Sequence, residues 1–526
     1  MKKIIGISFL LLFLLPSIAN AHDFVVDGIF YEIIDNQAYV ARKGAYSNVE
    51  SPNYKGHINI PSTVTYLGVT YPVTGIATGA FERCNEVTDI TIPNTIIHIG
   101  IDAFSGTAWY DQQPDGLVYV GNVVYKYKGT MPDNARIVIK DGTLGIADNA
   151  FGFCRGLTSI DIPNSVIIVG QNAFSGTAWY NQQPDGLVYA GNVVYKYKGT
   201  MPDNTHIRIK EGTPSISPNA FSKCAGLTSV DIPNSVTYIG SGAFNKCSGL
   251  TNIDIPNSVI SIGSGVFCEC SGLTSVAIPT SLTAIPHTAF AGCTSLKNVT
   301  IPNTITSIDK YAFHNCSALA VLNIPNSVIT INSDAFKGTA WYNAQPNGVV
   351  YAGLIAYNYK GAMPQNAQIE LREGTIGIAP YAFNKCGAMA SVIIPNTVKT
   401  IGDNAFAECT GLKSVTIPNS VKIIGYESFR ECSSLTSVNL PKSIAVIDIM
   451  AFAYCSALED VYIDVANPSS IIMGDIVFVG SQQSSKRVLH VPAGSLAAYK
   501  AKNCWSQYFE MIVEKAQTGS KRNRRH

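Results

Sequence analysis

Cysteine is the reactive residue type with the most regular spacing in this chain of 526 residues. Eleven of the thirteen Cys residues stand three positions after a recurring Phe, and the exceptions are Cys268 and Cys504. Equivalent positions in stacked repeats would point their Cβ atoms the same way, which is poor geometry for a disulfide. We therefore expect a row of buried, reduced thiols, with a disulfide framework as the alternative in an oxidising compartment. The regularly spaced residues are Cys84, Cys154, Cys224, Cys247, Cys270, Cys293, Cys316, Cys386, Cys409, Cys432 and Cys455.

The other reactive residue types form no recognisable cluster. Cys268-x-Cys270 is the nearest approach to a metal-ligand pair, and no His lies at a repeat position near it. The eight His residues fall at unrelated repeat positions, and the sequence motifs of zinc proteases, P-loops, nucleophile elbows and calcium loops are absent. We predict no catalytic residue, no metal ligand and no cofactor. The alternative is a catalytic pair that meets in space from neighbouring repeats.

A repeat must provide the elements that position these side chains. A Phe recurs fourteen times, and every interval is 23 or 47 residues. One repeat reads F-x-x-C-x-x-L-x-x-V-x-I-P-x-x-V-x-x-I-G-x-x-A, as from Phe221 to Ala243. Leu227, Val230 and Ile232 have the spacing of a leucine-rich repeat strand, and Pro233 ends it because proline cannot donate to a ladder. Since one repeat cannot bury its apolar positions alone, the pattern predicts a solenoid. The markers are Phe81, Phe104, Phe151, Phe174, Phe221, Phe244, Phe267, Phe290, Phe313, Phe336, Phe383, Phe406, Phe429 and Phe452.

A glycine follows the second apolar segment of many repeats. In the example above it is Gly240, after Val236 and Ile239. We expect this glycine to adopt a positive φ at a corner of the coil, because it has no Cβ. It recurs at Gly100, Gly170, Gly263, Gly402 and Gly425.

The repeated pattern C-x-x-L-x-x-V-x-I-P-N-S-V-x-x-I-G-x-x-A-F resembles the BspA-like leucine-rich repeat family of bacterial surface proteins, over about residues 56–465. The fold class expected from the repeat and the resemblance is a β-rich (α+β) solenoid, a leucine-rich-repeat superhelix of 23-residue coils with three inserted β-hairpins. The resemblance also implies extracellular recognition or adhesion, often toward host surface or matrix proteins. Ligands differ between family members, so the resemblance names no partner.

The three hairpins are predicted where the Phe markers are 47 residues apart. These intervals contain cassettes at residues 105–138, 175–208 and 337–370, and each adds 24 residues before the strand of an ordinary coil. In the first cassette, two alternating runs flank Gly121-Asn122, which is a strong hairpin signal. Insertions in a solenoid lie on one face, often the binding face.

Aromatic and lysine side chains of these hairpins are the candidate ligand-binding residues. Tyrosine offers a large, rigid contact with a polar tip. A two-stranded hairpin is marginal alone, so some rings must pack on the coil beneath, and Trp109 with Tyr110 is the expected anchor. Which of the other rings are packed and which are exposed stays open. The candidates are Tyr125, Lys126, Tyr127, Lys128, Tyr195, Lys196, Tyr197, Lys198, Tyr357, Tyr359 and Lys360.

The ends of the chain carry signals of a different kind. Lys2 and Lys3 precede the apolar stretch 4–15 and the small residues 19–21, which predicts a signal peptide at 1–21. No later run is apolar enough for a membrane span, so we expect no integral membrane segment in the mature chain. We expect an N-terminal β cap at 22–55, the solenoid at 56–465, a C-terminal cap at 466–515 and a disordered basic tail at 516–526. The C-terminal cap should contain a strand at 488–491 and a helix from near Pro492.

These observations favour a binding protein. The net charge of +1 gives no general attraction to nucleic acid. We predict an exported, non-enzymatic monomer, secreted or at the cell surface, that mediates protein–protein interaction or adhesion with an extracellular or host protein. The alternative is a glycan-binding module that uses the aromatic hairpins. A protein partner could use the open sheet face, whereas a glycan site needs exposed rings.

Overall fold

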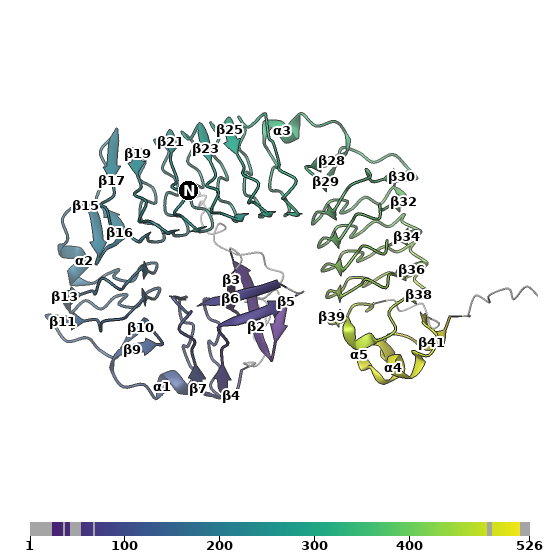
Figure 1. Ribbon diagram of the computed structural model, residues 1–526, viewed down its shortest axis with the longest axis horizontal. Coiled ribbons are helices and arrows are strands. Elements are labelled where there is room, and N and C mark those ends of the chain that lie inside the picture. The colour runs from purple at the N-terminus through teal and green to yellow at the C-terminus, as the bar shows by residue number, and fades with distance from the viewer. Residues whose placement is uncertain (1–23, 35–36, 43–53, 67–68, 481–486, 516–526) are drawn as a thin grey trace, which may run out of the picture. The chain divides into compact units, whose positions relative to one another are not determined.

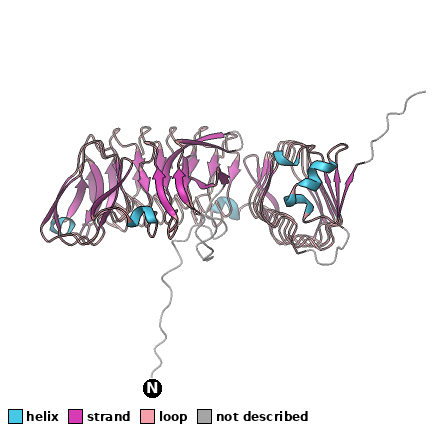
Figure 2. Ribbon diagram, turned by 90° about the horizontal axis from the view of Figure 1, so that it is seen from below, coloured by secondary structure: helices cyan, strands magenta, loops and turns pink. Residues whose placement is uncertain are grey.

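The computed structural model describes residues 24–34, 37–42, 54–66, 69–480 and 487–515 (Figure 1). The predicted signal peptide and basic tail lie outside the described residues. The chain forms two compact units, Met1–Asn245 with Pro256–Val266 and Lys246–Ile255 with Phe267–His526. Strands dominate both units, and the helices are short (Figure 2).

The first unit begins with a mixed sheet in the order β1-β2-β3-β6-β5. An antiparallel meander, β1 to β3, pairs in parallel with β6, and β6 pairs with β8, the second strand of the next coil. This sheet therefore continues directly into the repeat. The antiparallel pair of β5 and β6 was not anticipated from the sequence. The bounds are β1 Phe24–Val26, β2 Ile29–Ile34, β3 Gln37–Val40, β5 Thr63–Tyr66, β6 Val69–Ile76 and β8 His98–Ile99.

Most coils have two short strands, and these pair in parallel with the equivalent strands of a neighbouring coil. The partners are 23 residues apart in ordinary coils, as for Ile239 and Ile262, which confirms the predicted solenoid of 23-residue coils. In the first unit the first strands are β4 Gly56–Asn59, β7 Val87–Thr91, β11 Ala135–Val138, β13 Leu157–Asp161, β17 Thr205–Arg208 and β19 Leu227–Asp231. Its second strands include β12 Gly145–Ile146, β14 Ile168–Val169, β18 Ser215–Ile216, β20 Tyr238–Ile239 and β22 Ser261–Ile262.

The second unit repeats this arrangement in two three-stranded and two seven-stranded sheets. Its first strands are β21 Asn252–Ile253, β23 Ser275–Ala277, β25 Asn298–Thr300, β30 Ala367–Glu370, β32 Met389–Ile393, β34 Ser414–Thr416, β36 Ser437–Leu440, β38 Asp460–Ile463, β40 Val488–Val491 and β41 Met511–Glu514. Its second strands include β24 Ala284–Ile285, β26 Ser307–Ile308, β27 Thr330–Ile331, β31 Gly377–Ile378, β33 Thr400–Ile401, β35 Ile423–Ile424, β37 Val446–Ile447 and β39 Ile472–Met473. The 3₁₀ helix η1 Pro468–Ser470 precedes β39.

The C-terminal end of the core is covered by two short helices. The predicted strand at 488–491 is present as β40, and α4 Leu496–Ala501 and α5 Asn503–Ser506 follow it. The buried rings of Tyr499 and Trp505 pack against the core cluster that begins in the coils. A single helix was expected from near Pro492, but the structure has two helices, and the first begins at Leu496. The break between them falls at Lys502, which has an extended backbone.

The marker phenylalanines form the centre of the core in both units. Phe151 and Phe174 stack with centroids 5.4 Å apart, and Phe383 and Phe406 stack at 5.2 Å. The backbone N–H of Phe151 donates to the carbonyl of Ala173 in the next coil, so ring stacking and main-chain bonding share one period. Burial of so many rings is the main source of stability for stacked coils that could not fold singly.

The expectation for the repeat glycines was wrong. Gly240 is not among the residues with positive φ, whereas Gly242, two residues later, has a φ of 62°. A Cβ on Gly240 would lie 2.4 Å from the backbone nitrogen of Pro218 in the preceding coil. Glycine is therefore required here because two backbones approach closely, and the positive-φ corner is a separate position.

Nine of the eleven repeat cysteines are buried as predicted, Cys154 and Cys386 are partly exposed, and none of the thirteen cysteines forms a disulfide. Their thiols donate to the core backbone: Sγ of Cys293 to the carbonyl of Phe267 at 3.1 Å, and Sγ of Cys316 to that of Phe290 at 3.0 Å. Burial raises the pKa of Cys316 to about 12 and holds the pKa of Cys293 well above its ordinary value. Both groups are thus thiols and not thiolates at neutral pH.

We expect the buried thiols to resist alkylation in the folded protein. Iodoacetamide at about pH 8 attacks thiolates, and a raised pKa together with burial removes them. Mass spectrometry should find the partly exposed Cys154, Cys268, Cys386 and Cys504 modified first, and the nine buried cysteines modified only on unfolding. Unfolding without reductant should expose close to thirteen free thiols, and a markedly lower count would reveal disulfides instead.

Candidate binding site

The three predicted hairpins are present. In the first cassette β9 Gly116–Val120 and β10 Val123–Lys128 pair antiparallel around Gly121-Asn122. The second hairpin is β15 Gly186–Ala190 with β16 Val193–Lys198, and the third is β28 Gly348–Ala352 with β29 Ile355–Lys360.

One strand of each hairpin belongs to the solenoid itself. Val123 and Val124 of β10 pair in parallel with Gly145 and Ile146 of β12, so β10 is a second strand of a coil. The N–H of Tyr127 donates to the carbonyl of Ala150 at 2.8 Å, the bond that a marker Phe makes in other coils. The 24 additional residues therefore complete a coil of their own, and β9 pairs with β10 alone at the edge of the sheet.

A short helix precedes each hairpin: α1 Ala108–Asp111, α2 Ala178–Gln182 and α3 Ala340–Asn343. The Thr107 hydroxyl caps α1 by accepting from the N–H of Tyr110. The ring of Trp109 lies 5.1 Å from that of Phe104, and both Trp109 and Tyr110 pack against the core. The predicted anchor of the hairpin is confirmed.

Three of the candidate contact residues are buried, which corrects their expected position. Tyr125 is 2% exposed, and Tyr195 and Tyr357 are buried in the same way. The strand alternation shifts at a β-bulge between Val124 and Lys126, so that Val124 and Tyr125 both point inward. The Tyr125 hydroxyl accepts from the N–H of Phe104 at 3.2 Å. It thus replaces the alanine carbonyl that bonds the marker N–H in ordinary coils, and burial raises its pKa. These rings have no surface for a ligand.

The last lysine of each hairpin is used by the cassette helix. Nζ of Lys128 donates to the carbonyls of Tyr110, Asp111 and Gln113 at 3.2, 2.7 and 2.5 Å. Lys360 bonds the equivalent carbonyls of Tyr342, Asn343 and Gln345, and Lys198 those of Asn181 and Gln183. A cation at carbonyls that end a helix is stabilising, so the primary role of these three lysines is structural.

The remaining candidates are partly exposed. Lys126 pairs with Asp102 at 3.2 Å, and Lys196 is its equivalent in the second cassette. Tyr127 and Tyr359 pack against the core from its edge, and Tyr197 has the same partial exposure. Lys126 and Lys196 are therefore the candidates that retain a solvent-facing cation.

An open groove of about 420 Å³ lies beside the second cassette. Its lining comes from the end of β13, from α2 and the turn after it, and from β15 and its turn. Sequence reasoning did not find this groove, because its two sides come from different coils. The lining residues are Ile160, Asp161, Ile162, Trp179, Gln183, Tyr189 and Gly191.

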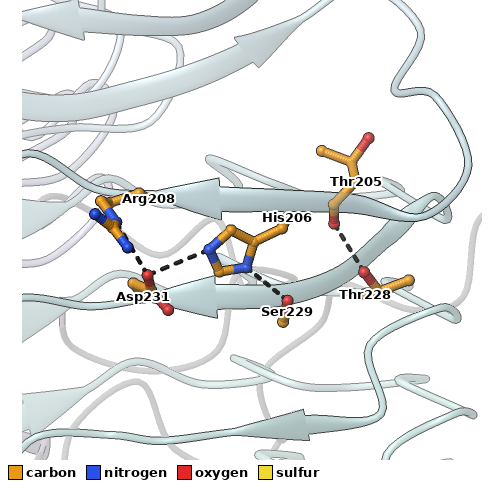
Figure 3. Close-up of polar contacts among 6 residues, drawn as sticks. All are labelled: Thr205, His206, Arg208, Thr228, Ser229 and Asp231. Atoms are coloured by element: carbon orange, nitrogen blue, oxygen red, sulfur yellow. Dashed lines mark hydrogen bonds and ion pairs between the residues drawn. The ribbon is translucent and has the colours of Figure 1, made fainter.

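A second polar cluster lies on the exposed face of β17 and β19 (Figure 3). Nδ1 of His206 is 2.7 Å from Oγ of Ser229, and its Nε2 is 3.2 Å from Oδ2 of Asp231. Nε of Arg208 donates to the same carboxylate oxygen at 3.2 Å. A serine, a histidine and an aspartate in contact are the groups of a hydrolytic triad, and the alternative of a catalytic pair from neighbouring repeats becomes concrete here.

The surroundings of His206 favour a surface patch over a hydrolytic site. The side chains of His206 and Asp231 are 49% and 50% exposed, so water competes for both hydrogen bonds. Arg208 shares the oxygen that would orient the histidine base. Catalysis also needs donors placed around a reacting oxygen in a water-excluded site, and these side chains lie on an open pair of strands (Figure 3).

Metal binding and membrane crossing have no candidates in the part of the chain that the structure describes. No three His, Cys, Asp or Glu side chains come together there as a cation site. None of the helices there has the length and apolarity of a membrane span.

Comparison with known proteins identifies the repeat. The family model described as a BspA type leucine rich repeat region matches residues 57–127, 121–183, 214–342 and 374–488. A leucine-rich repeat protein from Bacteroides ovatus ATCC 8483 is 22% identical, over 94% of this chain and 100% of that chain, with a TM-score of 0.29. A leucine rich cell surface protein from Faecalibacterium prausnitzii A2-165 is 20% identical, over 95% of each chain, with a TM-score of 0.27. No curated protein matches the chain.

Proposed function

The chain belongs to the BspA-type leucine-rich repeat family, and on this premise we propose that it is an exported, non-enzymatic scaffold that binds a protein partner at the cell surface. The partner is an extracellular or host protein. Export is supported by the charged and apolar N-terminal stretch that resembles a signal peptide.

The observation that carries the proposal is the variable outer face of the first strands. The partly buried positions of β11, β17 and β30 are nearly the same, with Ile137, Ile207 and Ile369 in register, but the exposed positions of these strands differ. At one register position they carry Arg136, His206 and Gln368, each opposite a Ser of the following strand. A constant scaffold with a variable exposed sheet face is suited to recognition.

The chemistry of this face fits a protein partner. In the first unit charged groups alternate with exposed apolar ones: Val138, 64% exposed, lies opposite Asp161, which Arg136 holds at 2.8 Å. In the second unit Ile393 is similarly exposed opposite Glu370. Protein interfaces combine such apolar contacts with arginine and a polar rim. These contacts support binding through the open sheet face.

We expect the double change His206→Ala and Arg208→Ala to weaken capture of the partner at least about tenfold, as loss of one interface hot spot would. Stability should hold, because both side chains are exposed. The measurement is binding of the purified chain to intact host cells and matrix, followed by titration with the partner recovered.

The control is Lys223→Asn, which removes a cation from a corner of the same unit where φ is positive. Asparagine tolerates that backbone, so the control should bind like the parent. Equal affinity of the double variant and the parent, or loss of binding in the control alone, would contradict the proposal.

A further inference from the structure

The groove beside the second cassette is built from side chains that are already held in place. The ring of Trp179 rests on Phe174 with centroids 4.7 Å apart. The Tyr189 hydroxyl accepts from the N–H of Lys210 at 3.2 Å, while Nζ of Lys210 lies 4.2 Å from the centre of the Tyr189 ring. Both aromatic walls are therefore ordered before any ligand arrives, and little entropy is lost on binding.

The polar groups of the groove are acceptors. Nε2 of Gln183 donates to the carbonyl of Trp179 at 3.1 Å, which leaves the amide oxygen of Gln183 on the other side of the group. Arg136 donates to Oδ2 of Asp161 at 2.8 Å, and the carboxylate retains Oδ1. A ligand that satisfies both acceptors must present hydroxyl or amide donors.

We propose that this groove binds a neutral pyranose unit of a glycan. A sugar ring has an apolar face of C–H groups for the Trp179 and Tyr189 side and hydroxyl donors for Asp161 and Gln183. The volume of about 420 Å³ is within the range of small-ligand sites. Arg136 already balances the charge of the Asp161 carboxylate, so a ligand here needs no charge of its own. Asp161 borders both this groove and the protein-binding face, but Trp179, Gln183 and Tyr189 belong to the groove alone.

The same construction recurs in the other cassettes. Gln113 bonds the carbonyl of Trp109 at 3.0 Å, and Gln345 that of Trp341 at 3.0 Å. Tyr119 accepts from the N–H of Lys140 at 3.2 Å, as Tyr189 does from Lys210. The position of Asp161 is taken by Thr91 in the first cassette and by Asn323 in the third. The chain thus repeats the aromatic frame and varies the acceptor that would select the sugar.

The test is ¹⁹F NMR of the folded chain labelled with 5-fluorotryptophan. The four tryptophans are assigned by single Trp→Phe variants, and the fully buried Trp505 serves as the internal reference. Methyl glycosides of glucose, galactose, mannose and N-acetylglucosamine are titrated to about 50 mM. We expect at least one of them to shift the Trp179 resonance saturably and to leave that of Trp505 unchanged.

Two aspartates make a matched pair for the control. Asp161→Ala should weaken the titration at Trp179 by about tenfold, since a hydrogen bond to a charged group is lost. Asp161→Asn, which copies the third cassette, keeps one acceptor and should bind at intermediate strength. Asp231 occupies the equivalent position on β19, where it binds Arg208 of β17 outside the groove. Asp231→Ala should therefore leave sugar binding unchanged.

The outcomes separate this site from the proposed protein-binding face. No shift of Trp179 with any glycoside overturns the glycan site, and a shift with short peptides alone assigns the groove to a peptide and also overturns it. If Asp161→Ala and Asp231→Ala reduce the Trp179 shift equally, the sugar does not bind in the groove, and the proposal is wrong. None of these results depends on whether His206 and Arg208 bind a protein.

Discussion

Replacing Phe290 by Ala should destabilise its coil and the coils on either side by about 3–5 kcal/mol. Phe290 is fully buried, and its ring stacks on Phe267 and on Phe313 with centroids 5.4 Å apart in each case. The substitution removes the shared ring of two stacks and leaves a cavity that stiff coils cannot close. Among ordinary coil positions, we expect substitution of a stacked marker Phe to cause the largest loss of stability.

The measurement should resolve individual coils, because long repeat arrays depart from two-state unfolding. Hydrogen exchange of amides near Phe267 and Phe313 should rise, together with a lower urea midpoint. Phe153→Ala is the matched control, since Phe153 is 78% exposed and its loss should change stability by less than about 0.5 kcal/mol. If Phe290→Ala and Phe153→Ala lower the stability equally, the stacked marker phenylalanines are not the main stabilising contacts of the core.

Replacing Tyr195 by Ser should cost about 3–5 kcal/mol of local stability in the second cassette. The ring lies 5.4 Å from Phe174 and 5.6 Å from Tyr180, in edge contacts with both, and its hydroxyl accepts from the N–H of Phe174 at 3.1 Å. Serine removes the ring and leaves a buried N–H without its acceptor. Tyr195→Phe keeps the ring and should cost about 1–3 kcal/mol for that unpaired N–H alone.

The neighbouring Lys196 provides the control for this prediction. Lys196→Ser changes a partly exposed side chain of the same strand and should alter stability by less than about 0.5 kcal/mol. Hydrogen exchange and thermal melts of the three variants give the comparison. If Tyr195→Ser melts like the parent but binds a partner less well, the ring is a contact surface, and the packing described for it is wrong.

The sequence alone predicted the repeat architecture, but not the antiparallel pair of β5 and β6 or the two helices of the C-terminal cap. Marker residues at 23-residue intervals predict stacked coils, since no single coil can bury its own apolar face. Gly121-Asn122 between alternating runs predicted the hairpin, and the fixed place of Cys in eleven of the fourteen repeats predicted the free thiol ladder. These features depend on local pattern and on period, which a linear chain displays directly.

The tertiary structure decided which side chains face solvent. Alternation along β10 does not reveal the bulge at Tyr125, and a one-residue shift moves a side chain from one face to the other. The amine of Lys128 meets carbonyls of α1, and Gly240 meets the backbone of the preceding coil. Such contacts join different coils or elements, so no local pattern records them.

The candidate sites divide in the same way. The sequence pointed to the cassettes and to their Trp and Tyr residues, but the groove exists only because Asp161 of β13 lies beside Trp179 and Tyr189. His206 meets Ser229 and Asp231, 23 and 25 residues away, because parallel pairing of β17 with β19 sets their register. Period and alternation are properties of the chain, whereas close approach between coils depends on how the coils pack, and that packing decides what each side chain can touch.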